Sequence, residues 1–317
     1  MDTTSLSRRA LMTSTTTGLA LAGAGASAGT GRPRSRAAAR FPGDPGPGRL
    51  YYGAFVQYPM AIGTYERRVG GRIGTRRSYF QAAQVAGLVA RARKDVRGGR
   101  LPMVSTKLPA SWRDVATGLH DDWLAALLDG LAALDAPVLL TLNHEPENDV
   151  DGGSQQPGWF VEMQERAIVH AATWAPKVTI VPILMHWTFD AGSGRDPRAW
   201  EVPSAALFGF DAYNWWSHLN NTPWTGFGAM LRRVRPYAGG RPLVVGEYGV
   251  RRCPNNPGRS ARWMRNAYRH AVENDVVAMS YFDNRDGDPD GDFALGGPRM
   301  RAFRRGLADE RSVALRG

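Results

Sequence analysis

Eight short apolar runs recur between residues 50 and 317, and helical patterns separate them. The runs span residues 51–56, 73–80, 101–107, 138–143, 178–186, 207–213, 243–247 and 276–282. Each has the length of a buried strand and ends in polar or aromatic residues, although Arg76 and Arg77 weaken the second run. Eight strand–helix repeats predict an α/β fold, a (β/α)8 TIM barrel that forms one catalytic domain over residues 50–317. A doubly wound open sheet is the alternative, but no Gly-rich phosphate loop follows the first run.

The first 49 residues differ in composition from the rest of the chain. Arg8 and Arg9 precede a weakly apolar stretch of Ala, Gly, Leu and Thr, and residues 26–28 are Ala-Ser-Ala. Residues 1–28 therefore resemble a twin-arginine signal peptide, which would export a folded protein. Residues 29–49, rich in Gly, Pro, Ala and Arg, predict a linker. No other apolar run approaches the ~18 residues that a membrane span requires, so we expect a secreted protein without stable membrane insertion.

The formal charge of +11 at pH 7 raises the question of an anionic partner. The first 49 residues contribute +5, from seven arginines and two aspartates, which leaves +6 for the body. The body has no Lys/Arg run with interleaved aromatic residues, the pattern of proteins that bind single-stranded nucleic acid. We therefore expect no nucleic-acid partner. The single cysteine, Cys253, excludes an internal disulfide.

Two glutamates stand at the ends of predicted strands. The fourth run passes into Asn143, His144 and Glu145, and the seventh ends at Glu247 between two glycines. In a closed barrel the carboxyl ends of these strands face one cavity. Glycoside hydrolysis needs such a pair, with one neutral carboxyl to protonate the leaving oxygen and one carboxylate to attack the anomeric carbon. Glu147, just beyond Pro146, is the alternative acid, but it lies further from the strand.

The body of the chain resembles glycoside hydrolase family 26, in the clan of retaining (β/α)8 glycosidases, over most of residues 50–300. Four motifs carry the resemblance: His-Glu at 144–145, Gly-Glu-Tyr-Gly at 246–249, Tyr-Gly-Ala-Phe at 52–55 and Tyr-Phe-Asp at 281–283. The resemblance implies that Glu145 is the acid/base and Glu247 the nucleophile, with a covalent glycosyl-enzyme and no cofactor. Members are mainly β-mannanases, with some β-1,3-1,4-glucanases and xylanases. Pro146 and Glu147 replace the apolar residue and Asn that members often carry, which affects the substrate more than the mechanism.

Several other residues are candidates for supporting the chemistry or for binding sugar. Tyr213 resembles the family tyrosine that donates a hydrogen bond to the nucleophile, and His144 could bond the nucleophile or a sugar hydroxyl. Sugar rings need aromatic platforms, and several tryptophans follow predicted strands. Trp187 is the first choice for stacking a sugar beside the scissile bond. The full set of supporting candidates is Asn143, His144, His186, Trp187, Tyr213, Trp215, Trp216 and Asp283.

An acidic loop after the eighth run is the one candidate metal site. Asp286, Asp288 and Asp290 have the D-x-D-x-D-G spacing of a calcium loop. The twelfth position is Gly297 rather than the bidentate Glu that such a loop requires, so calcium is a weak expectation.

The sequence thus predicts a secreted, monomeric, retaining endo-β-glycosidase that acts on a polysaccharide, with β-1,4-mannan as the first candidate substrate. A β-1,3-1,4-glucanase or a xylanase of the same fold is an alternative. The rivals from other classes are a non-catalytic carbohydrate-binding barrel of the cell envelope and a basic surface protein that binds an anionic polymer.

Overall fold

Nine parallel strands form one sheet in the order β5-β4-β3-β2-β1-β9-β8-β7-β6 in the computed structural model. The structure describes residues 39–217, 219, 222–285 and 292–316, so the predicted leader and the first part of the predicted linker lie outside it. The strands are β1 (Tyr51–Val56), β2 (Thr75–Phe80), β3 (Leu101–Thr106), β4 (Val138–Leu142), β5 (Val178–Ile180), β6 (Ile183–Met185), β7 (Phe208–Asn214), β8 (Leu243–Val250) and β9 (Val276–Asp283). The predicted (β/α)8 fold is confirmed, and each of the eight predicted runs overlaps a strand. The largest difference is in β8, which continues to Val250, three residues beyond the predicted end at Glu247.

The fifth predicted run forms two short strands, because Pro182 interrupts it. Proline has no backbone N–H to give to a neighbouring strand. On one side of it, β5 pairs with β4, and the Val181 amide donates to the Leu140 carbonyl at 2.8 Å. On the other side, β6 pairs with β7, and the Gly209 amide donates to the Pro182 carbonyl at 3.1 Å. Together β5 and β6 therefore serve as one barrel strand, which joins the two ends of the sheet.

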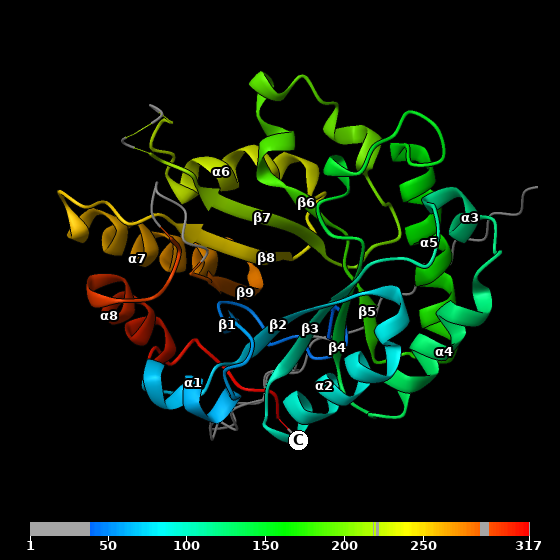
Figure 1. Cartoon of the computed structure of the whole chain (residues 1–317), viewed down its shortest axis with the longest axis horizontal. Helices are drawn as coiled ribbons and strands as arrows, with labels where there is room; N and C mark the ends of the chain where they lie inside the picture. Colours follow the sequence, from blue (N-terminus) through cyan, green and yellow to red (C-terminus); the bar gives the residue numbers. More distant parts are fainter. Residues whose placement is uncertain (1–38, 218, 220–221, 286–291, 317) are drawn as a thin grey trace, which may run out of the picture. The chain divides into compact units, whose positions relative to one another are not determined.

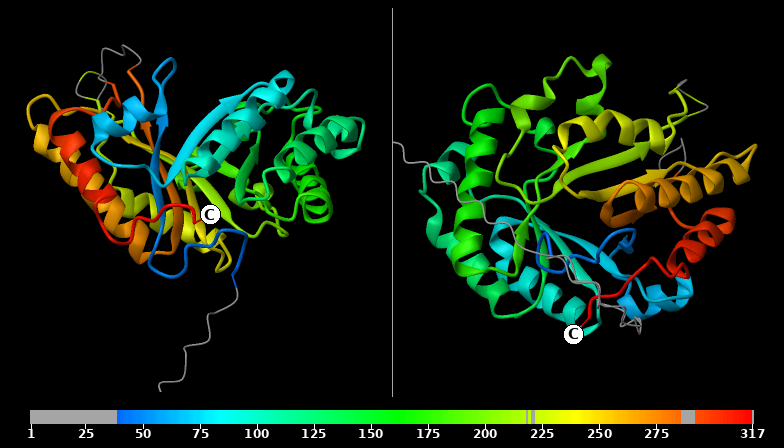
Figure 2. Two further views of the ribbon diagram at one scale, coloured as in Figure 1. Left: turned by 90° about the horizontal axis from the view of Figure 1, so that it is seen from below. Right: turned by 180° about the vertical axis from the view of Figure 1, so that it is seen from behind.

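In the part of the chain that the structure describes, eight α-helices connect the strands and cover the outside of the sheet (Figures 1 and 2). They are α1 (Ile62–Val69), α2 (Val85–Arg97), α3 (Trp112–Ala116), α4 (Asp121–Ala132), α5 (Pro157–Trp174), α6 (Phe227–Val234), α7 (Pro257–Glu273) and α8 (Gly297–Leu307). Short 3-10 turns are η1 (Ala82–Gln84), η2 (Pro146–Asn148), η3 (His186–Phe189), η4 (Ala191–Ser193), η5 (Pro197–Trp200) and η6 (Arg235–Tyr237). None of the helices within the described residues is long and apolar enough to cross a membrane.

The hydrophobic core has two parts. The larger part lies between the strands and the helices, where side chains such as Leu124, Leu127 and Phe160 are completely buried. The smaller part gathers residues near the amino ends of the strands, including Leu101 and Leu139. Phe41, from the stretch predicted as a linker, is only 4% exposed and belongs to this smaller cluster. The barrel is therefore filled at its amino-terminal end, and its chemistry must lie at the opposite end.

Candidate active site

The turn after β4 places Glu145 at the carboxyl end of the barrel. Asn143 and Glu145 both have positive φ, at 54° and 48°, so the chain bends sharply directly after the strand. Left-handed backbone is uncommon for residues other than glycine and requires support from its surroundings. The support here is the Glu145 amide, which donates to the Ile183 carbonyl of β6 at 2.9 Å. This bond fixes the Glu145 backbone against the neighbouring barrel strand.

The second predicted acid, Glu247, projects from β8 and is held by two phenol groups. The Tyr79 hydroxyl from β2 donates to Oε1, and the Tyr213 hydroxyl from β7 donates to Oε2. The guanidinium Nε of Arg77 lies 4.0 Å from Oε1. Hydrogen-bond donors and a nearby cation stabilise negative charge on a carboxylate. Glu247 is 7% exposed, so these contacts, rather than bulk water, set its surroundings.

A third buried carboxyl group, Asp211 of β7, lies beside Glu247. Its Oδ1 accepts the backbone N–H of Glu247 at 2.6 Å, which fixes the start of the glutamate side chain. A Cβ on Gly246 would lie 2.6 Å from the same oxygen, so only glycine permits this approach. Burial, followed by the charges of Glu247 and Glu145, raises the pKa of Asp211 well above its usual range. The surroundings of Asp211 therefore favour its uncharged, protonated form.

The environment of Glu145 favours a protonated carboxyl. Burial is the largest cause, and the charges of Glu247 and Glu147 add to it, so that the pKa of Glu145 rises to about 7. Arg77 and Lys107 oppose this shift but do not cancel it. Glu145 is therefore partly protonated near neutral pH, whereas two hydroxyls donate to Glu247. One acid is thus suited to give a proton, and the other to carry negative charge.

Glu145 lines a cavity of about 530 Å³ at the open end of the barrel, and Tyr213, which donates to Glu247, lines it as well. The cavity walls also include Asp211, His186, Trp187 and Trp215. The two tryptophans are 46% and 45% exposed, so their rings are accessible to a ligand. Burial lowers the pKa of His186 to about 4, which keeps this imidazole neutral. Flat apolar rings beside buried acids suit a ligand with hydroxyls and apolar C–H faces.

Two further predicted residues, His144 and Asn143, lie beside the acids. The His144 ring lies 5.2 Å from the Tyr79 ring, and its Nδ1 is 3.4 Å from the Ser105 hydroxyl. Burial, together with the charges of Arg77 and Lys107, lowers the pKa of His144 to about 3, so the ring is neutral. Asn143 accepts a hydrogen bond from Lys107 Nζ at 3.2 Å and donates to Asp149 at 2.9 Å. Asn143 thus holds the β4 turn together.

Glu147, the alternative acid, turns away from the cavity. Its Oε1 accepts the Met185 amide at 2.9 Å and the Thr188 hydroxyl at 2.6 Å. Met185 directly precedes η3, the turn that carries His186 and Trp187, and Thr188 lies within this turn. Glu147 therefore anchors this turn.

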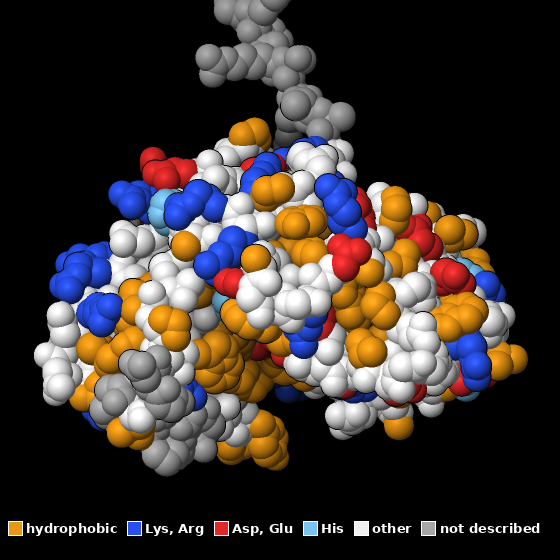
Figure 3. All heavy atoms as spheres, turned by 90° about the horizontal axis from the view of Figure 1, so that it is seen from above, with side chains coloured by type: hydrophobic (Ala, Val, Ile, Leu, Met, Phe, Trp, Pro, Cys, Tyr) orange, Lys and Arg blue, Asp and Glu red, His pale blue; other side chains and the backbone are white. Residues whose placement is uncertain are grey.

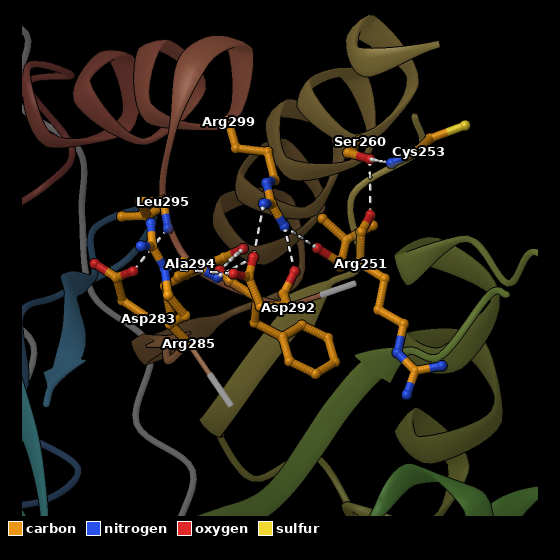
Figure 4. Close-up of polar contacts among 12 residues, drawn as sticks. Arg251, Cys253, Ser260, Asp283, Arg285, Asp292, Ala294, Leu295 and Arg299 are labelled. Atoms are coloured by element: carbon orange, nitrogen blue, oxygen red, sulfur yellow. Dashed lines mark hydrogen bonds and ion pairs between the residues drawn. The ribbon is translucent and has the colours of Figure 1, made fainter. Parts of the chain in front are cut away.

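Trp216 and Asp283 do not reach the cavity that the other candidates share. The Trp216 ring packs against Trp224, with centroids 5.9 Å apart. Asp283 is 5% exposed and accepts the Leu295 amide at 2.7 Å (Figure 4). Its other oxygen pairs with Arg68. Because both oxygens are occupied, Asp283 fastens the loop between β9 and α8 instead of facing a ligand.

The calcium candidates Asp286, Asp288 and Asp290 lie outside the described residues. Within the residues that are described, no group of three or more His, Cys, Asp or Glu side chains is placed to hold a metal ion.

The sequence analysis missed three residues of the site, namely Arg77, Tyr79 and Asp211. Arg77 is completely buried, and its guanidinium lies 4.9 Å from the centre of the Tyr79 ring. Residues two apart in a strand share a face, so Arg77 with Tyr79, and Asp211 with Tyr213, point into the barrel together. Arg77 and Asp211 are charged residues within predicted buried strands. A buried charge requires a partner, so these two residues could have been predicted to interact inside the barrel.

No model of a known protein family matches the sequence, and no curated protein matches it. Solved structures share its fold. An endo-β-1,4-mannanase from Cellulomonas fimi, described with family 26 mannanases, has a TM-score of 0.55 and 15% identity over 84% of this chain and 72% of that one. A β-mannanase from a symbiotic protist of the termite Reticulitermes speratus has a TM-score of 0.56 and 12% identity over 87% and 97%. A GH10 xylanase from Bispora has a TM-score of 0.54 and 11% identity over 82% and 97%. Identities this low show a common fold, whereas the chemistry must be argued from the site.

Proposed function

We propose that this chain is a secreted retaining endo-β-glycosidase, with Glu145 as acid/base and Glu247 as nucleophile. One observation carries the proposal: two tyrosine hydroxyls hold Glu247 within β8, while Glu145, just after β4, has a raised pKa. The signal peptide predicted at residues 1–28 supports secretion. No cofactor takes part in the proposed reaction.

The reaction has two steps. In the first, protonated Glu145 gives its proton to the glycosidic oxygen while Glu247 attacks the anomeric carbon, so that the leaving sugar departs and a glycosyl ester forms. Esterification removes the negative charge of Glu247, which is one of the causes of the raised pKa of Glu145. The pKa of Glu145 therefore falls in the intermediate. In the second step Glu145 acts as a base on water, and the water oxygen attacks the anomeric carbon and releases Glu247.

We assign β-1,4-mannan as the first candidate substrate, with mixed-linkage glucan and xylan as alternatives. The support is the resemblance to family 26 and the fold shared with two mannanases. Trp187 and Trp215, both half exposed at the cavity, are the proposed sugar platforms. The neutral His186 beside them would exchange hydrogen bonds with sugar hydroxyls.

The experiment compares the wild type with Glu247→Ala on mannan, mixed-linkage glucan and xylan. Loss of the nucleophile should lower kcat by about four orders of magnitude, with the circular dichroism spectrum unchanged. The control is Glu273→Ala, which removes an exposed acid of α7 and should leave turnover as it was. Proton NMR of the first product should show retained anomeric configuration.

Two results would overturn the proposal. If Glu247→Ala kept most of its turnover, the nucleophile would be elsewhere. If the wild type bound these glycans but released no reducing ends, the chain would be a carbohydrate-binding barrel without catalysis.

A further inference from the structure

A second hollow, of about 470 Å³, lies on the outside of the barrel between α6 and α7. One wall is a stripe of polar α7 side chains at positions 259, 262, 266 and 270, which are Arg259, Arg262, Asn266 and His270. Spacings of three and four residues place them on one helical face, over about 16 Å of helix length. Arg232 of α6 lies on the opposite wall. We call this hollow the α6–α7 groove.

The groove is strongly cationic. Of the residues that the structure describes, no Asp or Glu lines it, and none forms an ion pair with Arg232, Arg259 or Arg262. In contrast, the neighbouring Arg233 forms an ion pair with Asp190, at 2.5 Å. Figure 3 shows Lys and Arg side chains close together on its left side, where α6 and α7 lie. Three uncompensated guanidinium groups around one hollow favour an anionic ligand.

The first turn of α6 adds to this positive potential. Gly226 to Ala229 line the groove, and the N-cap residue Gly226 has no side chain to accept from the free N–H groups. The first turn also contains no acidic residue. The amino end of a helix carries a partial positive charge, so it acts in the same direction as the arginines.

The groove shares a wall with the catalytic cavity. Pro223 and Thr225 line the cavity, whereas Trp224 between them and Gly226 after them line the groove. The guanidinium of Arg259 lies 3.9 Å from the centre of the Trp224 ring, so a cation and a flat apolar surface occur together. A polymer that leaves the cavity across this short segment reaches the groove directly.

We propose that the α6–α7 groove binds the carboxylate groups of an acidic polysaccharide, that is, one containing uronic acid units. Planar guanidinium groups match carboxylates through paired hydrogen bonds, and the α7 stripe is long enough to contact several sugars of one chain. The choice of a glycan over other polyanions rests on the proposed function, because the groove adjoins the cavity where the glycan would be cleaved. The groove would hold the enzyme on an acidic matrix.

The test measures binding of polygalacturonate to the full-length protein by isothermal titration calorimetry at low salt. This polymer is α-linked, so the proposed β-glycosidase should not cleave it, and the titration measures binding alone. The result therefore does not depend on whether the chain hydrolyses β-glycans. We expect binding that weakens as salt is added, because screening reduces the attraction between exposed charges. The same polymer with its carboxylates methyl-esterified should not bind. Inorganic polyphosphate should bind more weakly than polygalacturonate.

The matched variants are two double substitutions on one helix. Arg259→Ala with Arg262→Ala should raise the Kd for polygalacturonate about tenfold. Arg265→Ala with Arg269→Ala removes the same charge from exposed α7 positions that do not line the groove, and should change the Kd less than twofold. Thermal melting checks that both variants are folded. The proposal is overturned if the two double variants bind alike, if the esterified polymer binds as well as the acid form, or if polyphosphate binds at least as tightly.

Discussion

Three carboxyl groups lie close together in this site, and their surroundings give them different charges. Glu247 receives two phenol hydroxyls, and burial and acidic neighbours keep Glu145 partly protonated. Burial also raises the pKa of Asp211, which favours its protonated form. Three full negative charges in one buried place would repel each other strongly. The raised pKa of Asp211 reduces this repulsion. Among the charges that raise the pKa of Glu145, that of Glu247, its proposed partner in the reaction, is the largest, followed by that of Glu147.

The raised pKa of Glu145 predicts how the rate depends on pH. Only the protonated form can give a proton to the leaving oxygen, so kcat/KM on mannan should fall as pH rises through about 7, tenfold per unit above it. A dinitrophenyl glycoside has a leaving group that needs no proton, so its first step should not show this decline. Rates measured from about pH 5 to about 9 on both substrates test the assignment. A flat profile on mannan across that range would contradict it.

At the scale of single elements, β2 shows why part of the site escaped prediction. Its central pair of arginines weakened the strand pattern, yet the two side chains point to opposite faces. Arg76 faces the helices, with Nη1 3.6 Å from Asp95, and Arg77 faces Glu247 inside the barrel. The strand ends and Glu145 could be located from local patterns. The contacts of Tyr79 and Asp211 with Glu247 could not be located in this way. Tyr79 and Asp211 lie 168 and 36 residues from Glu247 in the sequence, so no local pattern connects them.

The turn η3 depends on Glu147, which the sequence analysis weighed only as an acid. Glu147→Ala would leave the Met185 amide and the Thr188 hydroxyl without their acceptor. We expect it to lower the free energy of unfolding by about 1–3 kcal/mol. It should also raise KM several-fold with a smaller change in kcat, because Trp187 would lose its fixed position while both catalytic acids remain.

Glu147→Gln is the matched control for this prediction, since its amide keeps an accepting oxygen in the same place. It should recover most of the KM and the stability. Urea unfolding and steady-state kinetics on mannan measure both. Equal damage by the two substitutions would show that the charge of Glu147, and not its anchoring of η3, is what matters.

At the scale of the whole barrel, one end is filled and the other is open. Phe41, Leu101 and Leu139 belong to the cluster near the amino ends of the strands, and the cavity lies at the carboxyl ends. The Tyr51 hydroxyl donates to the Gly43 carbonyl at 2.8 Å, which ties residues before the first strand to the barrel. The Gly- and Pro-rich composition of residues 29–49 predicted a linker, and composition does not reveal whether a single aromatic residue in such a stretch is buried. The burial of Phe41 is visible only in the folded barrel.

This division between the two ends predicts that stability and catalysis can be changed separately. Phe41→Ala would remove a ring that is 4% exposed and leave a cavity among the amino-end side chains. We expect the free energy of unfolding to fall by about 3 kcal/mol, while kcat on mannan stays within twofold because Phe41 packs at the end of the barrel opposite the cavity. Leu119→Ala, at a side chain that is 70% exposed, should cost less than about 0.5 kcal/mol and serves as the control. Urea unfolding and initial rates on the same preparations test both statements. A large loss of kcat in folded Phe41→Ala would mean that packing at the closed end determines the geometry of Glu145 and Glu247 at the open one.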